Sequence, residues 1–386
     1  MCIRDSESYV QGAWFRGSGS PSSLYNATTE AEIAVCNTDG IDFGGVLDHA
    51  RAKGGTALRA MNFAERGEML KALSGAIHDH RDELLDLSIA NAGTTRKDAK
   101  FDIDGGTGTL AAYAYFAKEV GDRNHLTDGD GIQLGRTARF WGRHILVPMR
   151  GAAVHINAFN FPAWNMLEKA ACALLAGVPV IEKPGTPTAM VAWRIAQIVV
   201  ESGILPEGAF QFVAGRTGDL LDRMGSQDSL AFTGSAWTAM KLRSNENLLK
   251  NSVRVNIEAD SLNAAVLGPG VEPGSETFRL FIKNVALDMQ QKTGQKCTAV
   301  RRVLVPTDAL EDVRAELVAA LDAIKTGDPS DQNTTMGPLA SASQLEDVTG
   351  GIARLAASGR IVRGSDQRLG DQGYFVEPTL IETDDA

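Results

Sequence analysis

Apolar residues recur every three or four positions between residues 44 and 92, and this spacing predicts helices. A third helix is expected from about Thr107, within RKDAKFDIDGGTGTLAAYAYFAKEV. Residues 135–151 instead alternate in part between apolar and polar and are bounded by Gly and Pro. That second pattern predicts a strand or a hairpin.

From residue 151 onward, short apolar runs alternate with helical patterns. The runs GAAVHI, VPVIEKP, GAFQFVAG and SLAFTG are predicted strands, and each is followed by a stretch with helical spacing. Repeated strand–helix units predict an open, mostly parallel sheet with helices on both faces. In such sheets ligands bind beyond the carboxyl ends of the strands.

A second region is expected to begin near residues 255–260. ETFRLFIKNVALDMQQKTG predicts an amphipathic helix, AVRRVLVP a strand, and ALEDVRAELVAALDAIKTGDP a further helix. The chain is therefore expected to be an α/β protein with at least two structural regions.

Charge and cysteine content narrow the range of functions. The net charge is −10, which argues against broad binding of nucleic acid or anionic membranes. No apolar run reaches the roughly 18–20 residues that a membrane helix needs. The four cysteines show neither disulfide nor zinc spacing, so no metal site and a cytoplasmic location are expected.

Two of these cysteines lie in contrasting surroundings. Cys172 lies among Ala and Leu at helical spacing in LEKAACALLAG and is expected in the core. Cys297, in TGQKCTAVRR, follows polar and Gly residues and has Lys296 beside it, with Arg301 and Arg302 nearby. Cationic surroundings favour the thiolate, so Cys297 is the candidate nucleophile.

Two further polar residues suit acyl chemistry. Glu258 ends the apolar strand pattern VRVNIEADS, where burial would raise its pKa toward the range of a general base. The alternative is a surface acid at a strand end. Asn160, in NAFNFPAW, has an amide that could donate to an oxyanion, and the alternative is an ordinary turn residue.

Nucleotide binding is suggested at two strand ends. Lys183 in IEKPGTPTA could contact a ribose or its phosphate, or simply reach solvent. Gly234 and Ser235 in FTGSAWTAMKL open a helix after a strand, which suits pyrophosphate or an ordinary helix cap. GTGTLA at 106–111 matches a phosphate-binding pattern, but no buried strand precedes it, so a helix start is expected there.

In this order, NAFNFP, EKPGTPTA, FTGS, IEADSLN, GQKCTA, GDPSDQNTTMGPL and GYFVEPTL resemble the aldehyde dehydrogenase superfamily, from about residue 7 to the last residue. HINAFNFPAWNMLEKA, EADSLNAAVLG and TGQKCTAVRRVLVP are similar to one branch of it. That branch oxidises CoA-linked semialdehydes in aerobic aromatic degradation, including phenylacetate catabolism.

The resemblance implies an aldehyde dehydrogenase fold, with a Rossmann-like parallel-sheet cofactor domain and an α/β catalytic domain. Residues 7–134 would form the N-terminal helical part of the cofactor domain and 135–151 an oligomerisation strand or hairpin. Residues 152–257 would form the Rossmann-like NAD(P)-binding domain and 258–386 the catalytic domain. The family's Glu-x-Phe-Gly-Pro segment is not in the sequence, so a C-terminally truncated fragment that oxidises aldehydes poorly is expected.

The resemblance also implies roles for single residues. Cys297 would attack the aldehyde as a thiolate, Asn160 and the Cys297 backbone N–H would hold the oxyanion, and Glu258 would activate the hydrolytic water. Glu258 is preferred to Asp260 for this role. The implied cofactor contacts are Lys183, Thr186, Gly215, Gly218, Gly234 and Ser235.

The resemblance also implies a cofactor and a substrate. Many NAD-using members carry a glutamate where this chain has Thr186, so NADP is expected and NAD is the second option. A small-molecule aldehyde, CoA-linked, is the expected substrate, and the parent protein is expected to be a homo-oligomer. The alternatives are a CoA-acylating dehydrogenase, a catalytically silent nucleotide-binding or structural protein, and a redox sensor at Cys297.

Overall fold

The computed structural model describes residues 4–384, and its largest sheet lies where strand–helix units are predicted. Among these residues, seven strands pair in the order β12-β11-β8-β9-β10-β2-β3. The strands β8 to β12 run parallel, while β2 is antiparallel to β10 and β3. The elements from residue 153 to 259 are β8 (Ala153–Ile156), α6 (Trp164–Leu175), β9 (Val180–Lys183), η2 (Thr186–Thr188), α7 (Ala189–Ser202), β10 (Phe210–Phe212), η3 (Leu220–Arg223), β11 (Ser229–Gly234), α8 (Ala236–Arg243), α9 (Glu246–Lys250) and β12 (Arg254–Ala259).

The central strands form because their apolar runs are buried on both faces. Every residue of β8 and β10 is buried, as expected for a parallel sheet covered on both sides. The chain builds β8, β9 and β10 in one direction and then returns to place β11 and β12 on the other side of β8. This reversal creates a switch point between β8 and β11, and ligands bind at the carboxyl ends of strands beside such a point.

The N-terminal region supplies strands and a helical layer. Three of its strands form a separate sheet in the order β1-β5-β4. The helices agree with the predicted helical stretch 44–92. The elements are β1 (Arg4–Ser6), β2 (Ser8–Val10), β3 (Ala13–Phe15), β4 (Ser22–Tyr25), β5 (Glu32–Cys36), α1 (Phe43–His49), η1 (Ala50–Gly54), α2 (Gly55–Ala60), α3 (Phe63–Asp79), α4 (Arg81–Ala92) and α5 (Arg96–Val120).

Helix α5 corrects the expected helix start at Thr107. It begins at Arg96, and the Thr95 side chain caps it by accepting a hydrogen bond from the Asp98 backbone N–H at 3.2 Å. The GTGTLA stretch therefore lies in the middle of this helix. A Cβ at Gly105 would come within 2.3 Å of the Trp164 ring, so the glycines permit close packing of α5 on α6.

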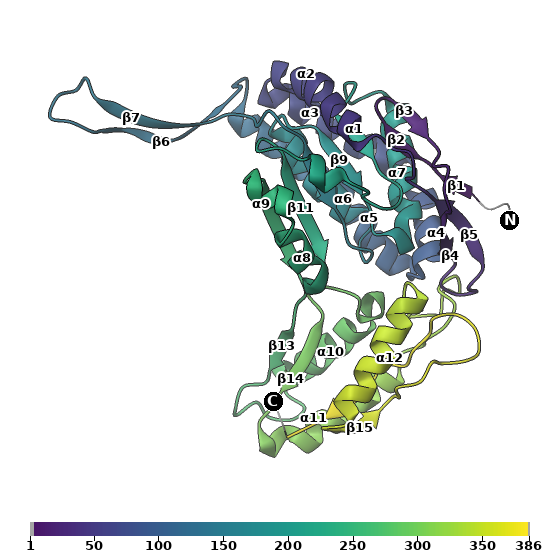
Figure 1. Cartoon of the computed structure of the whole chain (residues 1–386). Coiled ribbons are helices and arrows are strands. Elements are labelled where there is room, and N and C mark those ends of the chain that lie inside the picture. The colour runs from purple at the N-terminus through teal and green to yellow at the C-terminus, as the bar shows by residue number, and fades with distance from the viewer. Residues whose placement is uncertain (1–3, 385–386) are drawn as a thin grey trace.

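The strands β6 (Leu126–Gln133) and β7 (Trp141–Leu146) form a hairpin that extends far from the rest of the molecule (Figure 1). The predicted strand or hairpin at 135–151 covers the turn and β7, while β6 precedes it. Phe140, Trp141 and Ile145 are exposed on this arm. Its role in oligomerisation stays a prediction.

The C-terminal lobe begins where the chain leaves the large sheet after Ala259 (Figure 1). Its parallel strands β13 and β14 pack with α10 and α11 around Phe278, Ile282 and Val313. Within residues 4–384, no helix is long and apolar enough to cross a membrane. The elements are β13 (Asn263–Val266), α10 (Glu276–Gln290), η4 (Gln291–Gly294), β14 (Val300–Leu304), η5 (Thr307–Ala309), α11 (Leu310–Asp322), α12 (Ala342–Ala356), β15 (Arg360–Arg363) and β16 (Leu380–Glu382).

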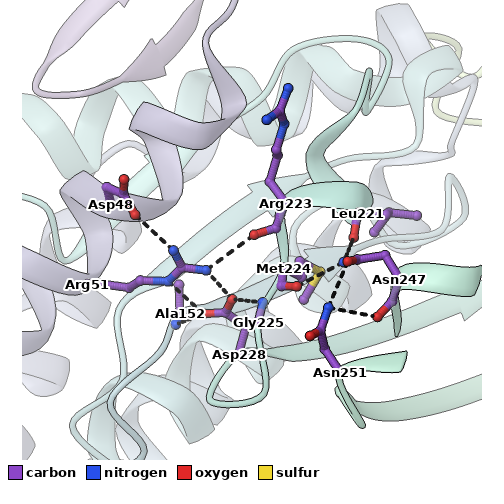
Figure 2. A network of polar contacts seen from close by, with 10 residues as sticks. All are labelled: Asp48, Arg51, Ala152, Leu221, Arg223, Met224, Gly225, Asp228, Asn247 and Asn251. Atoms are coloured by element: carbon purple, nitrogen blue, oxygen red, sulfur yellow. Dashed lines mark hydrogen bonds and ion pairs between the residues drawn. The ribbon is translucent and has the colours of Figure 1, made fainter. Parts of the chain in front are cut away.

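A polar network at the amino ends of β8 and β11 ties the N-terminal helices to the sheet (Figure 2). The carboxylate of Asp228, which is 1% exposed, accepts hydrogen bonds from the backbone N–H groups of Ala152 at 2.8 Å and Gly225 at 2.7 Å. Both carboxylate oxygens also bind the guanidinium of Arg51 in η1. One buried carboxylate thus joins three segments that are distant in sequence.

Candidate active site

Cys297 lies in an exposed turn between η4 and β14. Its backbone carbonyl accepts hydrogen bonds from the Asn263 side-chain amide at 2.6 Å and from the Ser261 hydroxyl. Both donors belong to the segment that directly follows β12. The turn is therefore anchored beside the carboxyl end of that strand.

The backbone before Cys297 takes an unusual course. Lys292, Thr293 and Gly294 have φ values of +53°, +55° and +69°. Residues other than glycine rarely adopt this left-handed backbone conformation. Lys292 and Thr293 therefore each cost about 1–3 kcal/mol of folding free energy. The Thr293 hydroxyl donates to the Gly337 carbonyl at 2.9 Å, which helps to hold the strained path. A conformation maintained at such a cost is typical of a functional turn.

Glu258, at the end of β12, faces the Cys297 thiol. Burial raises the pKa of Cys297, and both the charge of Glu258 and its hydrogen bond with the thiol raise it further. The Thr233 hydroxyl donates to the Glu258 carboxylate at 3.4 Å. The nucleophile and the base proposed from sequence therefore lie near each other, and Glu258 is a carboxylate that can accept the thiol proton.

The nearby cations do not favour the thiolate, contrary to the sequence-based expectation. The Lys296 ammonium points away to Asp288 and Gln291, at 2.7 and 2.8 Å. Arg301 donates to the Gly294 carbonyl at 2.6 Å. Both cations stabilise the loop, which leaves Glu258 as the charge that shifts the pKa of Cys297.

Of the two interpretations of Glu258, the structure supports the surface acid, and the expectation that Cys172 lies in the core is wrong. Glu258 is exposed because β12 is the edge strand of the sheet and its residues alternate between exposed and half-buried. Cys172 is exposed as well. Helix α6 buries its Leu167 and Leu174 side, so Cys172 lies on the side that faces away from the core.

Replacing Glu258 by glutamine is expected to lower the pKa of Cys297, because the carboxylate that raises it is removed. The thiolate fraction at neutral pH then rises, and alkylation of Cys297 by iodoacetamide should become about three- to tenfold faster. The rate is measured against pH by mass spectrometry of the Cys297 peptide. The matched control is Glu168→Gln, since Glu168 is a nearby carboxylate that does not shift Cys297. An unchanged pH profile in Glu258→Gln contradicts the contact.

Asn160 follows β8 and reaches the same turn. Its amide donates to the Gln295 carbonyl at 3.0 Å, and its own oxygen accepts from the Asn165 amide at 3.5 Å. Gln295 is two residues before Cys297, so the candidate oxyanion donor is held against the cysteine loop. In this structure a peptide oxygen engages one of the two N–H donors of the Asn160 amide.

The predicted cofactor residues gather at one edge of the sheet. The strand register aligns Ile156 with Lys183 and Thr233 with Glu258. Burial lowers the pKa of Lys183, and the Cys36 thiol on β5 opposes this shift. Lys183 is thus half-buried at the strand end rather than extended into solvent.

The same edge carries the other residues that the sequence predicts to bind a dinucleotide. Ser235 caps α8 by accepting from the Thr238 backbone N–H at 3.2 Å, while the first backbone N–H groups of that helix point toward the sheet edge. A Cβ at Gly234 would meet the Phe232 ring at 2.6 Å, so glycine lets this ring keep its place. Gly215 and Gly218 lie in the turn after β10, with φ values of +139° and +48°. Thr186 begins η2 beside Lys183.

Sequence reasoning missed the residues that support the catalytic turn. Ser261 and Asn263 hold the Cys297 carbonyl, and Gln295 accepts from the Ala340 backbone N–H at 3.1 Å. The polar run after Glu258 is a visible signal, but its partners are too distant in sequence to be identified. Among residues 4–384, no three His, Cys, Asp or Glu side chains gather in a way that could hold a metal ion.

Comparison with known proteins gives concordant matches. The model of the aldehyde dehydrogenase family matches residues 14–386. A 3,4-dehydroadipyl-CoA semialdehyde dehydrogenase from Aromatoleum evansii is 42% identical over 97% of this chain and 74% of that protein. Lactaldehyde dehydrogenase from Escherichia coli superposes with a TM-score of 0.86 at 24% identity, over 98% of this chain and 77% of the other. The NAD+ complex of an aldehyde dehydrogenase from Bacillus cereus superposes with a TM-score of 0.83 at 24% identity, over 98% and 75%.

Proposed function

The chain belongs to the aldehyde dehydrogenase family of NAD(P)-dependent aldehyde oxidoreductases, and from this premise we propose that it oxidises a CoA-linked semialdehyde with NADP. The observation that carries the proposal is that the Cys297 loop meets the segments of Glu258 and Asn160. Asn263, five residues after Glu258, binds the Cys297 carbonyl, and Asn160 binds the Gln295 carbonyl. The substrate class is supported by the name of the Aromatoleum evansii relative.

The first step uses the raised pKa of Cys297. Because the resting thiol is protonated, Glu258 takes its proton as the sulfur attacks the aldehyde carbon. The carbonyl π electrons move to oxygen, and the product is a thiohemiacetal. The Asn160 amide and the Cys297 backbone N–H donate to this oxyanion.

NADP+ would supply the hydride acceptor that oxidation of the thiohemiacetal to a thioester requires. Lys183, Thr186, Gly234 and Ser235 would hold it at the sheet edge, with the Gly215–Gly218 turn at the adenosine end. Glu258 first releases the thiol proton to solvent. It then removes a proton from water as the water attacks the thioester carbon. The acid leaves and the Cys297 thiol is restored by the proton from Glu258.

An apolar surface suited to an acyl chain lies next to Asn160. The rings of Phe101 and Trp164 are 5.4 Å apart, and Phe101 lies 5.7 Å from Phe161, which follows Asn160. Phe101 is 40% exposed, so this surface is accessible. The availability of Glu258 to activate water favours release of the acid over transfer of the acyl group to CoA.

A single-turnover experiment with the purified chain tests the proposal. NADPH formation is followed after mixing protein, NADP+ and either a CoA-linked or the matching free semialdehyde. We expect one NADPH per Cys297 with the CoA-linked aldehyde and slower formation with the free one. Acceleration by added free CoA would support the acylating alternative, and no NADPH from any aldehyde would contradict dehydrogenase chemistry.

Replacing Thr186 by glutamate is expected to shift binding from NADP+ to NAD+. A carboxylate at this position repels a 2′-phosphate and accepts a hydrogen bond from a 2′-hydroxyl, which should change the affinity ratio about 10- to 100-fold. The dissociation constants of both nucleotides are measured by calorimetry. Thr186→Gln, of similar size and neutral, is the control. A stronger preference for NAD+ in the unmodified chain would overturn the NADP assignment.

A further inference from the structure

Lys292, the other lysine of the cysteine loop, is buried, and its ammonium has no hydrogen-bond partner among the described residues. Lys292 is 3% exposed. The ammonium lies 4.1 Å from the centroid of the Phe161 ring. Burial lowers the pKa of Lys292, while the carboxylates of Asp102 and Asp98 oppose that shift. Lys292 is thus held by a ring and two charges rather than by directed bonds.

Asp102 connects this lysine to the segment that carries Asn160. Its carboxylate is fully buried and accepts the backbone N–H of Trp164 at 2.8 Å and that of Ala163 at 3.2 Å. These two amides open α6, three and four residues after Asn160. The stretch from Asn160 to these amides includes Phe161, and Lys292 packs against the ring of Phe161. Lys292 therefore interacts with the Asn160 segment in two ways, directly with the Phe161 ring and through the charge of Asp102.

We propose that Lys292 is a positioning residue, which fixes the cysteine loop and the Asn160 segment in the relative placement that oxyanion binding requires. The inference rests on the proposed thiohemiacetal chemistry. Asn160 and Cys297 come from different lobes and meet through one hydrogen bond between side chain and peptide, Asn160 to Gln295. Lys292 adds a second, buried link between the same two segments.

Charge and backbone geometry support this role. Without Lys292, the two buried carboxylates of Asp98 and Asp102 would face an apolar side chain, and their repulsion and desolvation would displace the loop. Lys292 also begins the left-handed path of the turn at φ +53°. Its position therefore determines where Gln295 presents the carbonyl that Asn160 contacts. Small displacements of this kind weaken the stabilisation of a reacting group strongly.

The test measures how well an aldehyde protects Cys297 from alkylation. Formation of the thiohemiacetal blocks iodoacetamide, and the half-protecting concentration of the CoA-linked semialdehyde is read by mass spectrometry of the Cys297 peptide. We expect Asn160→Ala to raise this concentration about 100-fold and Lys292→Met about 10-fold. In the double variant Lys292→Met should add less than about threefold to the loss caused by Asn160→Ala, because the donor through which the lysine acts is already absent.

The matched control is Lys296→Met, which removes the other buried lysine of the same loop. Lys296 binds Asp288 and does not face the Asn160 segment. Both lysine variants should lose thermal stability, so Tm does not separate them, but in Lys296→Met the Asn160 substitution should keep its full effect. Asp102→Asn, which retains the lysine, should reproduce the Lys292→Met result and keeps the test decisive if that variant fails to fold.

Two outcomes would overturn the inference. Additive effects of Lys292→Met and Asn160→Ala would show that the lysine does not act through Asn160. An unchanged half-protecting concentration of aldehyde in both Lys292→Met and Asp102→Asn would show that Lys292 does not position Asn160. If no aldehyde protects Cys297 in the unmodified chain although iodoacetamide labels it, the proposed function fails, and this inference fails with it.

Discussion

Replacing Cys297 by alanine is expected to abolish aldehyde-dependent NADPH formation, with a loss of about 10⁴-fold or more in rate. The proposed sequence of bonds begins at this sulfur, and neither Glu258 nor Asn160 can form the covalent intermediate in its absence. The single-turnover assay measures the loss directly, since the amplitude per protein molecule should fall to the blank. Binding of NADP+ should be unchanged, because Cys297 lies outside the residues assigned to the nucleotide.

Cys172→Ala is the control for this result. Cys172 is also an exposed thiol, yet it lies on α6 and is not placed in the reaction. Its loss should leave the NADPH amplitude within about twofold of the original value. If both variants lost activity equally, removal of either exposed thiol would have the same effect, and the specific role of Cys297 would be contradicted.

Replacing Asp228 by asparagine is expected to lower the free energy of unfolding by about 3 kcal/mol. The substitution leaves Arg51 facing a neutral amide, and one of the backbone donors of Ala152 and Gly225 loses its acceptor (Figure 2). Urea denaturation followed by tryptophan fluorescence measures the change.

The control for this stability change is Asp48→Asn, which removes the other carboxylate that binds Arg51. The Asp48 side chain is 77% exposed against 1% for Asp228, so its loss should cost about 0–1 kcal/mol. If the two variants were equally stable, the network would not be the connection between the N-terminal helices and the sheet. Additional loss of aldehyde chemistry in Asp228→Asn would show that the effect extends to the opposite edge of the sheet.

The fold could be predicted where burial imposes a strong periodic pattern. The strands β8 to β10 carry apolar runs that are covered on both faces, and β11 buries Leu230 and Phe232, so the sequence reveals all four. The strands of residues 4–36 are short and half-exposed, so they leave little periodicity to detect. The α5 boundary was missed because polar residues such as Asp98 and Asp102 are buried there for partners that only the tertiary structure supplies.

The site shows the same division. The order of the motifs identifies Cys297, Glu258 and Asn160, and the structure brings the three segments together. The electrostatic expectation for Cys297 was wrong because adjacency in sequence does not determine the direction of a side chain. Lys296 is adjacent to the nucleophile but pairs with Asp288. Burial raises the pKa of the thiol, and the charge that raises it further is Glu258, about forty positions earlier in the sequence.

The hydrogen bond from Asn160 to the Gln295 carbonyl determines what the Asn160 amide offers a reacting aldehyde. An amide nitrogen carries two N–H donors, so the peptide oxygen holds one and leaves the second available. Because the first bond fixes the plane of the amide, the second N–H has one direction before any substrate arrives. In the proposed reaction this donor would bind an oxygen that gains negative charge more strongly than a neutral aldehyde oxygen, so its stabilisation would be applied to the barrier rather than to substrate binding.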